Sequence, residues 1–100
     1  MQLKQVDKVE ILTLQDNYID LVEAPANAMI ARANPIKDGY VANSVVAEHG
    51  FSALVKITAG PKAHTLLFDF GYSPWGVVHN MEALGVDAGA IEVLALSHGH

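Results

Sequence analysis

Two runs of β-branched and apolar residues, separated by a Gly-Pro turn, constrain the fold of this chain more than any other feature. Residues 52–58 (SALVKIT) and 64–70 (HTLLFDF) flank a short segment, AGPK, that contains Gly60 and Pro61. Short runs of this composition on both sides of a glycine-containing turn are typical of two antiparallel strands. The sequence therefore predicts a β-hairpin over residues 52–70.

A helix is predicted directly after this hairpin. Ser73 is a suitable N-cap, and Pro74 suits the first helical position, where no backbone N–H is needed. Gly85 fits the left-handed residue that ends many helices. Between them lies an apolar stripe with helical spacing, formed by Val77, Val78, Met81 and Leu84.

Two further strands are predicted, over residues 9–15 (VEILTLQ) and 92–97 (EVLALS). The second is nearly all apolar, which is typical of a strand that is buried on both faces. Asp87 is expected to cap a short turn just before it. A hairpin followed by a helix and another strand indicates an α/β (α+β) domain with mixed layers.

The segment between the first strand and the hairpin has a different composition. Residues 23–43 include Pro25, Pro35 and Gly39, and they lack a regular apolar period. Such a segment is typical of a long irregular loop, and loops of this length in compact domains are usually functional or mobile. We therefore expect no regular structure over residues 23–43.

Composition and charge exclude several classes of function. The chain has 100 residues, a net charge of −5 and no cysteine. A chain of this length is expected to form one domain. Acidity with scattered bases is the opposite of what phosphate contacts with a nucleic acid require, and the lack of cysteine excludes thiolate metal sites and disulfides. The longest stretch without a charged residue, residues 70–81, is shorter than the roughly 18 residues of a membrane span. Charged residues among the first ten leave no apolar core for a signal peptide, so we expect a cytoplasmic protein with no nucleic-acid or membrane partner.

The sharpest chemical feature is the pair His98 and His100, which follows the last predicted strand. Residues i and i+2 of an extended backbone project to the same side, so the two imidazoles are spaced to hold one metal ion. Gly99 between them allows the backbone to bend. Zinc favours imidazole nitrogen, although a chance pair of histidines is an open alternative.

Asp69 closes an apolar strand, where an unpartnered carboxylate is costly. We expect it to accept hydrogen bonds from the loop of His98 and His100 and so to orient these ligands, with a turn cap as the alternative. Glu48 and His49 form the next acidic and imidazole pair. Adjacent side chains of an extended segment point to opposite faces, so both can serve one site only if the chain turns at Gly50. Both are pocket candidates, with a surface turn as the alternative for His49.

The remaining residues give weaker signals. His64 is expected to be solvated and His79 to be packed or half-exposed, while Asp16 and Asn17 are best explained as a turn. The nucleophile elbow, the phosphate-binding loop and the dinucleotide fingerprint do not occur in the sequence. Ser97 beside His98 does not predict a catalytic triad, because sequence neighbours rarely have the required geometry.

Four local segments together resemble the metallo-β-lactamase-fold hydrolase superfamily. They are AEHGFS at residues 47–52, LFDFG at 67–71, LGVD at 84–87 and LALSHGH at 94–100. In this order they are similar to the branch labelled as dihydropterin ribofuranosylaminobenzene phosphate synthase-like. The resemblance covers residues 9–100 and the N-terminal half of that fold, and the last segment matches the start of its H-x-H-x-D-H metal motif. Phe70 stands where the family often has a small or hydroxyl residue.

The resemblance implies a four-layer αββα sandwich with a mixed, mostly antiparallel sheet and one or two zinc ions, or iron or manganese, at the sheet edge. His98 and His100 match the first two metal ligands, and Asp69 matches the acid near the metal loop. A metal-activated water would attack an ester, amide or phosphoester of a small-molecule substrate. Residues 1–100 would be a partial domain that ends within the metal motif. We therefore expect weak zinc binding, no turnover by these 100 residues, and self-association through exposed sheet edges.

Two other interpretations remain open. The chain is either a non-catalytic binding or assembly module, whose histidine pair is incidental or holds a metal between subunits, or a small α/β domain with an unrelated ligand site in residues 23–43.

Overall fold

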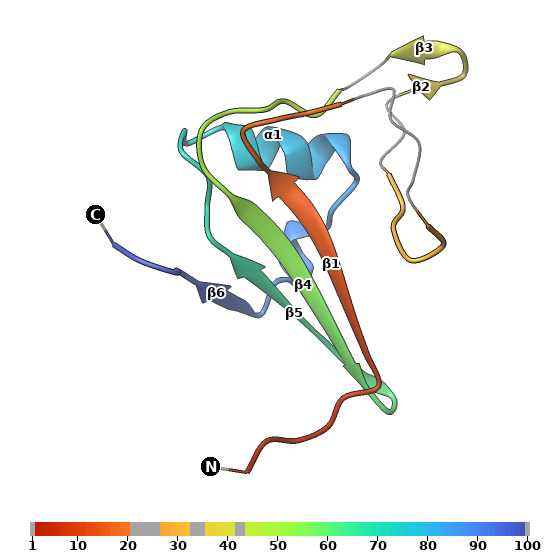
Figure 1. Cartoon of the computed structure of the whole chain (residues 1–100), viewed down its shortest axis with the longest axis vertical. Coiled ribbons are helices and arrows are strands. Elements are labelled where there is room, and N and C mark those ends of the chain that lie inside the picture. Colours follow the sequence, from red (N-terminus) through yellow and green to blue (C-terminus); the bar gives the residue numbers. More distant parts are fainter. Residues whose placement is uncertain (1, 21–26, 33–35, 42–43, 100) are drawn as a thin grey trace.

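The computed structural model describes residues 2–20, 27–32, 36–41 and 44–99. A four-stranded sheet with the order β1-β4-β5-β6 carries one helix, α1, on one face (Figure 1). Neighbouring strands are antiparallel except for β5 and β6, which are parallel. This arrangement confirms the predicted mixture of α and β layers. The strands of this sheet are β1 (Lys8–Gln15), β4 (Ser52–Ala59), β5 (Lys62–Phe68) and β6 (Val93–Ala95).

The predicted hairpin is formed by β4 and β5. Ala59 pairs with Lys62 across the two-residue loop of Gly60 and Pro61, as the composition of the segment indicates. The second strand ends at Phe68 and not at residue 70, because Asp69 adopts the left-handed backbone conformation with φ of 55°. Aspartate is among the few residues other than glycine that tolerate this region.

Helix α1 (Gly76–Ala83) begins two residues later than the sequence predicts. The hydroxyl of Ser73 nevertheless accepts a hydrogen bond from the Gly76 backbone N–H at 3.0 Å, so Ser73 supports the first turn. The predicted C-terminus is confirmed, since Gly85 has φ of 68°. The N–H of Val86 donates to the Met81 carbonyl at 2.8 Å, which is one of the two bonds of a Schellman motif.

The core lies between this helix and the sheet. Its buried members are Leu14, Leu67, Val77 and Met81, and partly buried residues such as Leu54 and Leu84 surround them. The predicted stripe is therefore confirmed for Val77 and Met81 but wrong for Val78, which is 55% exposed. Val78 lies about 100° around the helix from Val77 and faces away from the sheet. The i+3 position of the buried stripe is taken instead by Asn80, which is 1% exposed.

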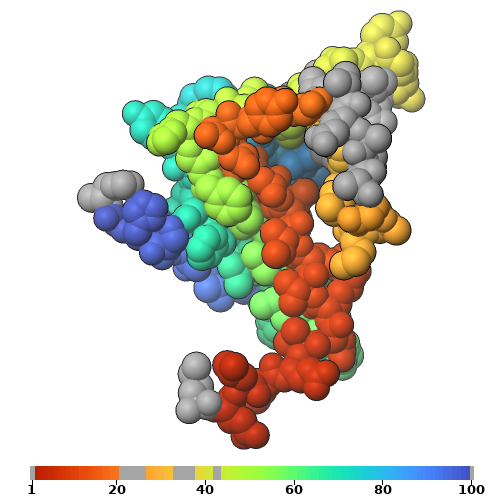
Figure 2. Space-filling model, in the orientation of Figure 1, coloured from red at the N-terminus to blue at the C-terminus, as the bar shows by residue number. Residues whose placement is uncertain are grey.

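The opposite face of the sheet carries apolar side chains that no other described segment covers. Ile11 is 67% exposed and Val9 is 51% exposed, and Phe68 and Val93 are exposed on the neighbouring strands. Figure 2 shows β1, β4, β5 and β6 side by side at the front surface, with no described segment over them. Among the described residues, β1 and β6 are the outer strands of this sheet, and the sequence predicts self-association through such edges. We call the surface of Val9, Ile11, Phe68 and Val93 the open face.

The last strand differs from its prediction. The sequence predicts a strand at residues 92–97 that is buried on both faces, whereas β6 has three residues and Leu94 is 66% exposed. Among the described residues β6 pairs only with β5, so it is an edge strand. The short turn before it is confirmed, because Asp87 accepts a hydrogen bond from the N–H of Gly89 at the start of the 3-10 helix η1 (Ala88–Ala90).

The prediction of an irregular loop over residues 23–43 is wrong in one part. Strands β2 (Ile36–Lys37) and β3 (Tyr40–Val41) form a small hairpin that projects from the domain (Figure 1). Its turn residues Asp38 and Gly39 have φ of 53° and 80°. Asp-Gly is a strong signal for a tight hairpin turn, because both turn residues must adopt positive φ. Residues 23–26, 33–35 and 42–43 of this segment lie outside the described residues.

Candidate functional site

The candidate site begins where the parallel strands β5 and β6 end. Asp69 follows β5 directly, and Ser97 and His98 follow β6 after one further residue. Because two neighbouring parallel strands end at the same edge of a sheet, the side chains that follow them come together there. This edge is where the sequence predicts a metal site.

Every polar group of Asp69 that could hold its position has a partner. Its N–H donates to the Ala95 carbonyl at 2.9 Å, and its carbonyl accepts from the buried Ser52 hydroxyl at 2.7 Å. Its two carboxylate oxygens accept from Ser97, at 2.7 Å from the backbone N–H and at 2.6 Å from the hydroxyl. These contacts keep the residue in its left-handed conformation, which would otherwise be unfavourable.

The hydrogen bonds from Ser97 also stabilise the ionised form of this carboxylate. The Ser97 hydroxyl, followed by the Ser97 backbone N–H, lowers the pKa of Asp69 below its ordinary value, because both bonds favour the ionised form. Asp69 is therefore an anion near neutral pH. The expected hydrogen bonds to the loop of His98 are present, whereas the role of Asp69 in orienting metal ligands stays a prediction.

The direction of these bonds determines which ring nitrogen of His98 carries a proton. The Ser97 Oγ lies 2.6 Å from the Asp69 carboxylate and 2.8 Å from His98 Nδ1. An ionised carboxylate only accepts, so the single hydroxyl hydrogen of Ser97 goes to Asp69, and Ser97 Oγ accepts from the Nδ1–H of His98. In the neutral imidazole the lone pair then lies on Nε2, which is the nitrogen able to bind a metal.

A cavity of about 520 Å³ opens beside these three residues. It brings the loop after β6 next to the turn after β1 and the segment before β4. His49 contacts the ring of Tyr72 edge-on in its wall, with 6.0 Å between the ring centroids. Polar residues of the wall are Asp16, Asn17, His49, Asp69 and His98. His49 therefore lies in the wall of this cavity and is also exposed at the bend before β4, a position that agrees with both of its interpretations.

Glu48 points elsewhere and is not among the residues of this cavity. Its Oε1 accepts hydrogen bonds from the Ser73 hydroxyl at 2.8 Å and from the Ser73 N–H at 3.1 Å. The carboxylate thus lies against the start of α1, where the positive end of the helix dipole favours an anion. Adjacent residues 48 and 49 do point to different sides, as the extended segment requires.

Two buried amides hold the segment that carries His49. The side chain of Asn80 pairs with the Val46 backbone, donating to its carbonyl at 2.9 Å and accepting from its N–H at 2.8 Å. The same amide donates to the Leu14 carbonyl at 2.7 Å and to Gln15 Oε1 at 3.1 Å. Gln15 in turn donates to the Val46 carbonyl at 3.3 Å. Together Gln15 and Asn80 fasten this segment to β1 and α1.

Gly50 fixes the last step of the segment. Its φ is 112°, and a Cβ added there would lie 2.9 Å from the Gly71 carbonyl carbon and 3.0 Å from the Tyr72 nitrogen. Both neighbours are backbone atoms, which cannot move aside as a flexible side chain can. Only glycine therefore lets the chain turn from His49 into β4 at this distance from the wall of the cavity.

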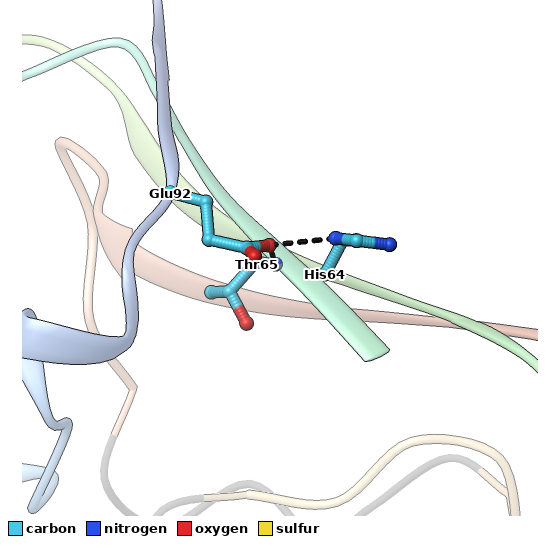
Figure 3. A network of polar contacts seen from close by, with 3 residues as sticks. All are labelled: His64, Thr65 and Glu92. Carbon is cyan, nitrogen blue, oxygen red and sulfur yellow. Dashed lines mark hydrogen bonds and ion pairs between the residues drawn. The ribbon is translucent and has the colours of Figure 1, made fainter. Parts of the chain in front are cut away.

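The other described histidines lie outside this site. His64 is exposed, as predicted, and its Nδ1 lies 2.9 Å from Glu92 Oε2, which also accepts from the Thr65 N–H at 3.2 Å (Figure 3). His79 is half-buried, as predicted, and its Nε2 lies 2.9 Å from the Ser44 carbonyl. Both positions are remote from Asp69 along the sheet and the helix.

The fit of a metal rests on His98 within the part of the chain that the structure describes. His100, the second predicted ligand, lies outside it. No group of three or more histidine, aspartate or glutamate side chains among the described residues could hold a metal ion. The Nδ1–H contact of His98 nevertheless matches the arrangement of metal-binding histidines, whose second ring nitrogen is held by a hydrogen bond.

Sequence reasoning misses four residues of this site, namely Gln15, Ser52, Asn80 and Ser97. Gln15, Ser52 and Asn80 are the most completely buried side chains among the described residues. Asn80 could have been found, because it occupies a core position of the helical stripe and a buried polar group needs partners. Ser97 carries no such signal.

A comparison of the chain with protein families, with curated proteins and with solved structures finds no match in any of the three. None of the described helices combines the length and the apolar composition that are needed to cross a bilayer.

Proposed function

We propose that the chain is a metal-dependent hydrolase of the metallo-β-lactamase fold, similar to the branch that its four sequence segments resemble. The single observation that carries the proposal is the hydrogen-bonded series Asp69, Ser97 and His98 at the ends of two parallel strands. It holds one imidazole with Nε2 as its basic nitrogen, which is the form that zinc binds.

The apolar side chains of the open face are compatible with the second sheet that an αββα sandwich requires. A four-layer αββα sandwich packs a second sheet against the first, and such packing requires apolar side chains on the face opposite the helix. The open face has this composition, since Val9, Ile11, Phe68 and Val93 are all apolar and exposed. The sandwich itself remains part of the proposal.

The proposed roles of the residues follow from their contacts. His98 and His100 would hold the metal. When bound, the metal would supply an activated water as the nucleophile for an ester, amide or phosphoester. Asp69 would act through Ser97 and not as a ligand, since Ser97 donates to both of its carboxylate oxygens and contacts the His98 ring. Asp69 and Ser97 would instead orient the His98 ring, and His49 would line the cavity next to it.

Zinc binding by the 100-residue protein tests this proposal without depending on a substrate. Equilibrium titration with zinc is expected to show binding that His98→Ala weakens at least tenfold. Ser97→Ala is expected to weaken it about tenfold, because residues that orient a ligand typically contribute 10–100-fold. His79→Ala is a matched control, since it removes a half-buried imidazole outside the site. The proposal fails if zinc binding is unchanged by His98→Ala, and equal losses for His79→Ala would indicate incidental binding.

A further inference from the structure

The cavity at the site has three exposed aromatic rings in its wall. Phe51, Phe70 and Tyr72 are 41%, 39% and 76% exposed, and they come from the segments on either side of His49 and Asp69. The volume of about 520 Å³ lies within the range of roughly 300–1,000 Å³ that is typical of small-molecule sites. Exposed aromatic surface in a concave site is typical of ligand-binding grooves.

The charges around these rings have one sign. Asp16 and Asp69 line the cavity, and no lysine or arginine is among the described residues of its wall. Both oxygens of the Asp69 carboxylate accept hydrogen bonds from Ser97, which holds this group in the wall of the cavity. Since the cavity is negative and partly apolar, it attracts cations and repels anions.

We infer that this cavity binds a flat organic cation, with its ring against Phe51, Phe70 and Tyr72 and its positive group toward Asp16 and Asp69. Aromatic faces attract cations, and stacked or edge-on rings add further contact area. The inference goes beyond the proposed function and does not rest on it, because it is argued for the metal-free cavity. Binding itself requires no metal, because all the contacts come from side chains of the wall.

The same cavity disfavours a ligand that carries an anionic group. A phosphate or carboxylate in this cavity would need a basic side chain or a metal ion to offset the two aspartates. In the metal-free protein the described wall provides neither kind of partner apart from the histidines. The metal-free protein therefore separates the two ligand classes most clearly.

The test is a ¹H–¹⁵N NMR titration of the metal-free protein, in the presence of EDTA, with three probes of similar shape. Benzamidine is a flat cation, benzamide is its neutral analogue and benzoate is an anion. Benzamidine is expected to give saturable shifts at the amides of Asn17, Phe51 and Tyr72. Benzamide is expected to bind at least fivefold more weakly, and benzoate to give no saturable shift. Equal or tighter binding of benzoate would overturn the inference, as would benzamidine shifts confined to other parts of the chain.

Two substitutions test the two halves of the inference separately. Phe70→Ala removes a ring and is expected to weaken benzamidine binding at least threefold. Asp16→Asn removes a charge and is also expected to weaken benzamidine binding at least threefold. The substitution keeps the local turn, because the Asn17 N–H, which donates to Asp16 Oδ1 at 2.7 Å, can still donate to the amide oxygen. Tyr40→Ala and Glu82→Gln are matched controls, because both residues are exposed and lie outside this cavity. If the controls weaken binding as much as the two site variants do, the inference fails.

The outcome is independent of the zinc titration. Benzamidine binding without zinc binding would keep the ligand site and refute the hydrolase proposal. Zinc binding at His98 without benzamidine binding would refute the inference and leave the hydrolase proposal standing.

Discussion

One face of the sheet lies under α1 and the other lies open, although both carry apolar side chains. On the α1 face, Leu14 and Leu67 are 3% and 8% exposed, whereas on the open face Ile11 and Phe68 are 67% and 36% exposed. The residues alternate along the same strands, so each strand contributes to both faces. The two faces therefore differ in what packs against them more than in their composition.

This difference shows which part of the apolar content stabilises the fold. Burial of apolar surface contributes roughly 25 cal/mol per Å², but only for area that is removed from water. Of the five hydrophobic side chains buried among the described residues, Leu14, Leu67, Val77 and Met81 form the core between α1 and the sheet, whereas the open face leaves much of its area solvated. We therefore expect equivalent substitutions on the two faces to have unequal effects.

The largest effect is expected from a matched pair of truncations. Leu67→Ala should lower the free energy of unfolding by about 3 kcal/mol, because it leaves a cavity between β5 and α1. Ile11→Ala should lower it by less than about 1 kcal/mol, because its side chain is already largely solvated. Urea unfolding followed by circular dichroism measures both. Equal losses for the two variants would show that the open face is covered in solution.

A smaller loss is expected from the polar part of the α1 side. Asn80→Ala should lower the free energy of unfolding by about 2 kcal/mol, because the Leu14 carbonyl and the Val46 N–H lose their hydrogen bonds to the buried amide. Glu82→Ala on the exposed side of the same helix serves as the control. Hydrogen exchange should also show faster exchange at Val46 in Asn80→Ala. An Asn80→Ala protein as stable as the control would mean that the amide contacts contribute nothing.

The elements with a local cause could be predicted from the sequence. The hairpin of β4 and β5, the left-handed Gly85 and the Asp87 cap each depend on a few adjacent residues, and all three are confirmed. The Asp38-Gly39 turn has an equally local cause, and only its position among prolines and irregular sequence obscures it. The expected hydrogen bonds of Asp69 could also be predicted, since an acid after an apolar strand needs a partner.

The remaining features depend on contacts between distant residues. A nearly all-apolar run does not tell whether its strand lies inside a sheet or at its edge, and the predicted burial of residues 92–97 is wrong because β6 is an edge strand of the described sheet. Asn80 bonds to residues 34 and 66 positions away, and a polar residue on a helix is more often solvated. A serine after a strand gives no signal of its own for a site. Only the parallel pairing of β5 with β6 brings Ser97 next to Asp69.

Self-association is a third property in which the open face and the α1 side are expected to differ. The sequence predicts association through exposed sheet edges, and the open face adds apolar surface next to the β1 edge. Ile11→Lys should shift the protein toward the monomer in sedimentation velocity runs over a concentration series, because a charge at this position opposes burial. Val78→Lys introduces the same charge at an exposed residue of α1 and should leave association unchanged. A wild-type protein that stays monomeric throughout the series would contradict the prediction.

The smallest expected effect concerns the exposed contact that joins the residue before β6 to β5. The bond from His64, followed by that from the Thr65 N–H, lowers the pKa of Glu92 below its ordinary value. A carboxyl whose pKa is lowered in the folded state stabilises the fold above its unfolded pKa, and this contribution disappears as the pH falls through the folded value. His64→Ala should therefore raise the pKa of Glu92 toward the ordinary value of about 4.3, as measured by NMR titration of its side-chain carboxyl. The same substitution should leave the pKa of Glu10 unchanged, since the pKa of Glu10 is lowered by Lys8 on β1.

Added salt should reduce the difference in Glu92 pKa between the wild-type protein and His64→Ala, because the side chains of His64 and Glu92 are both about half exposed or more. A Glu92 pKa that does not move in His64→Ala would mean that the contact does not persist in solution.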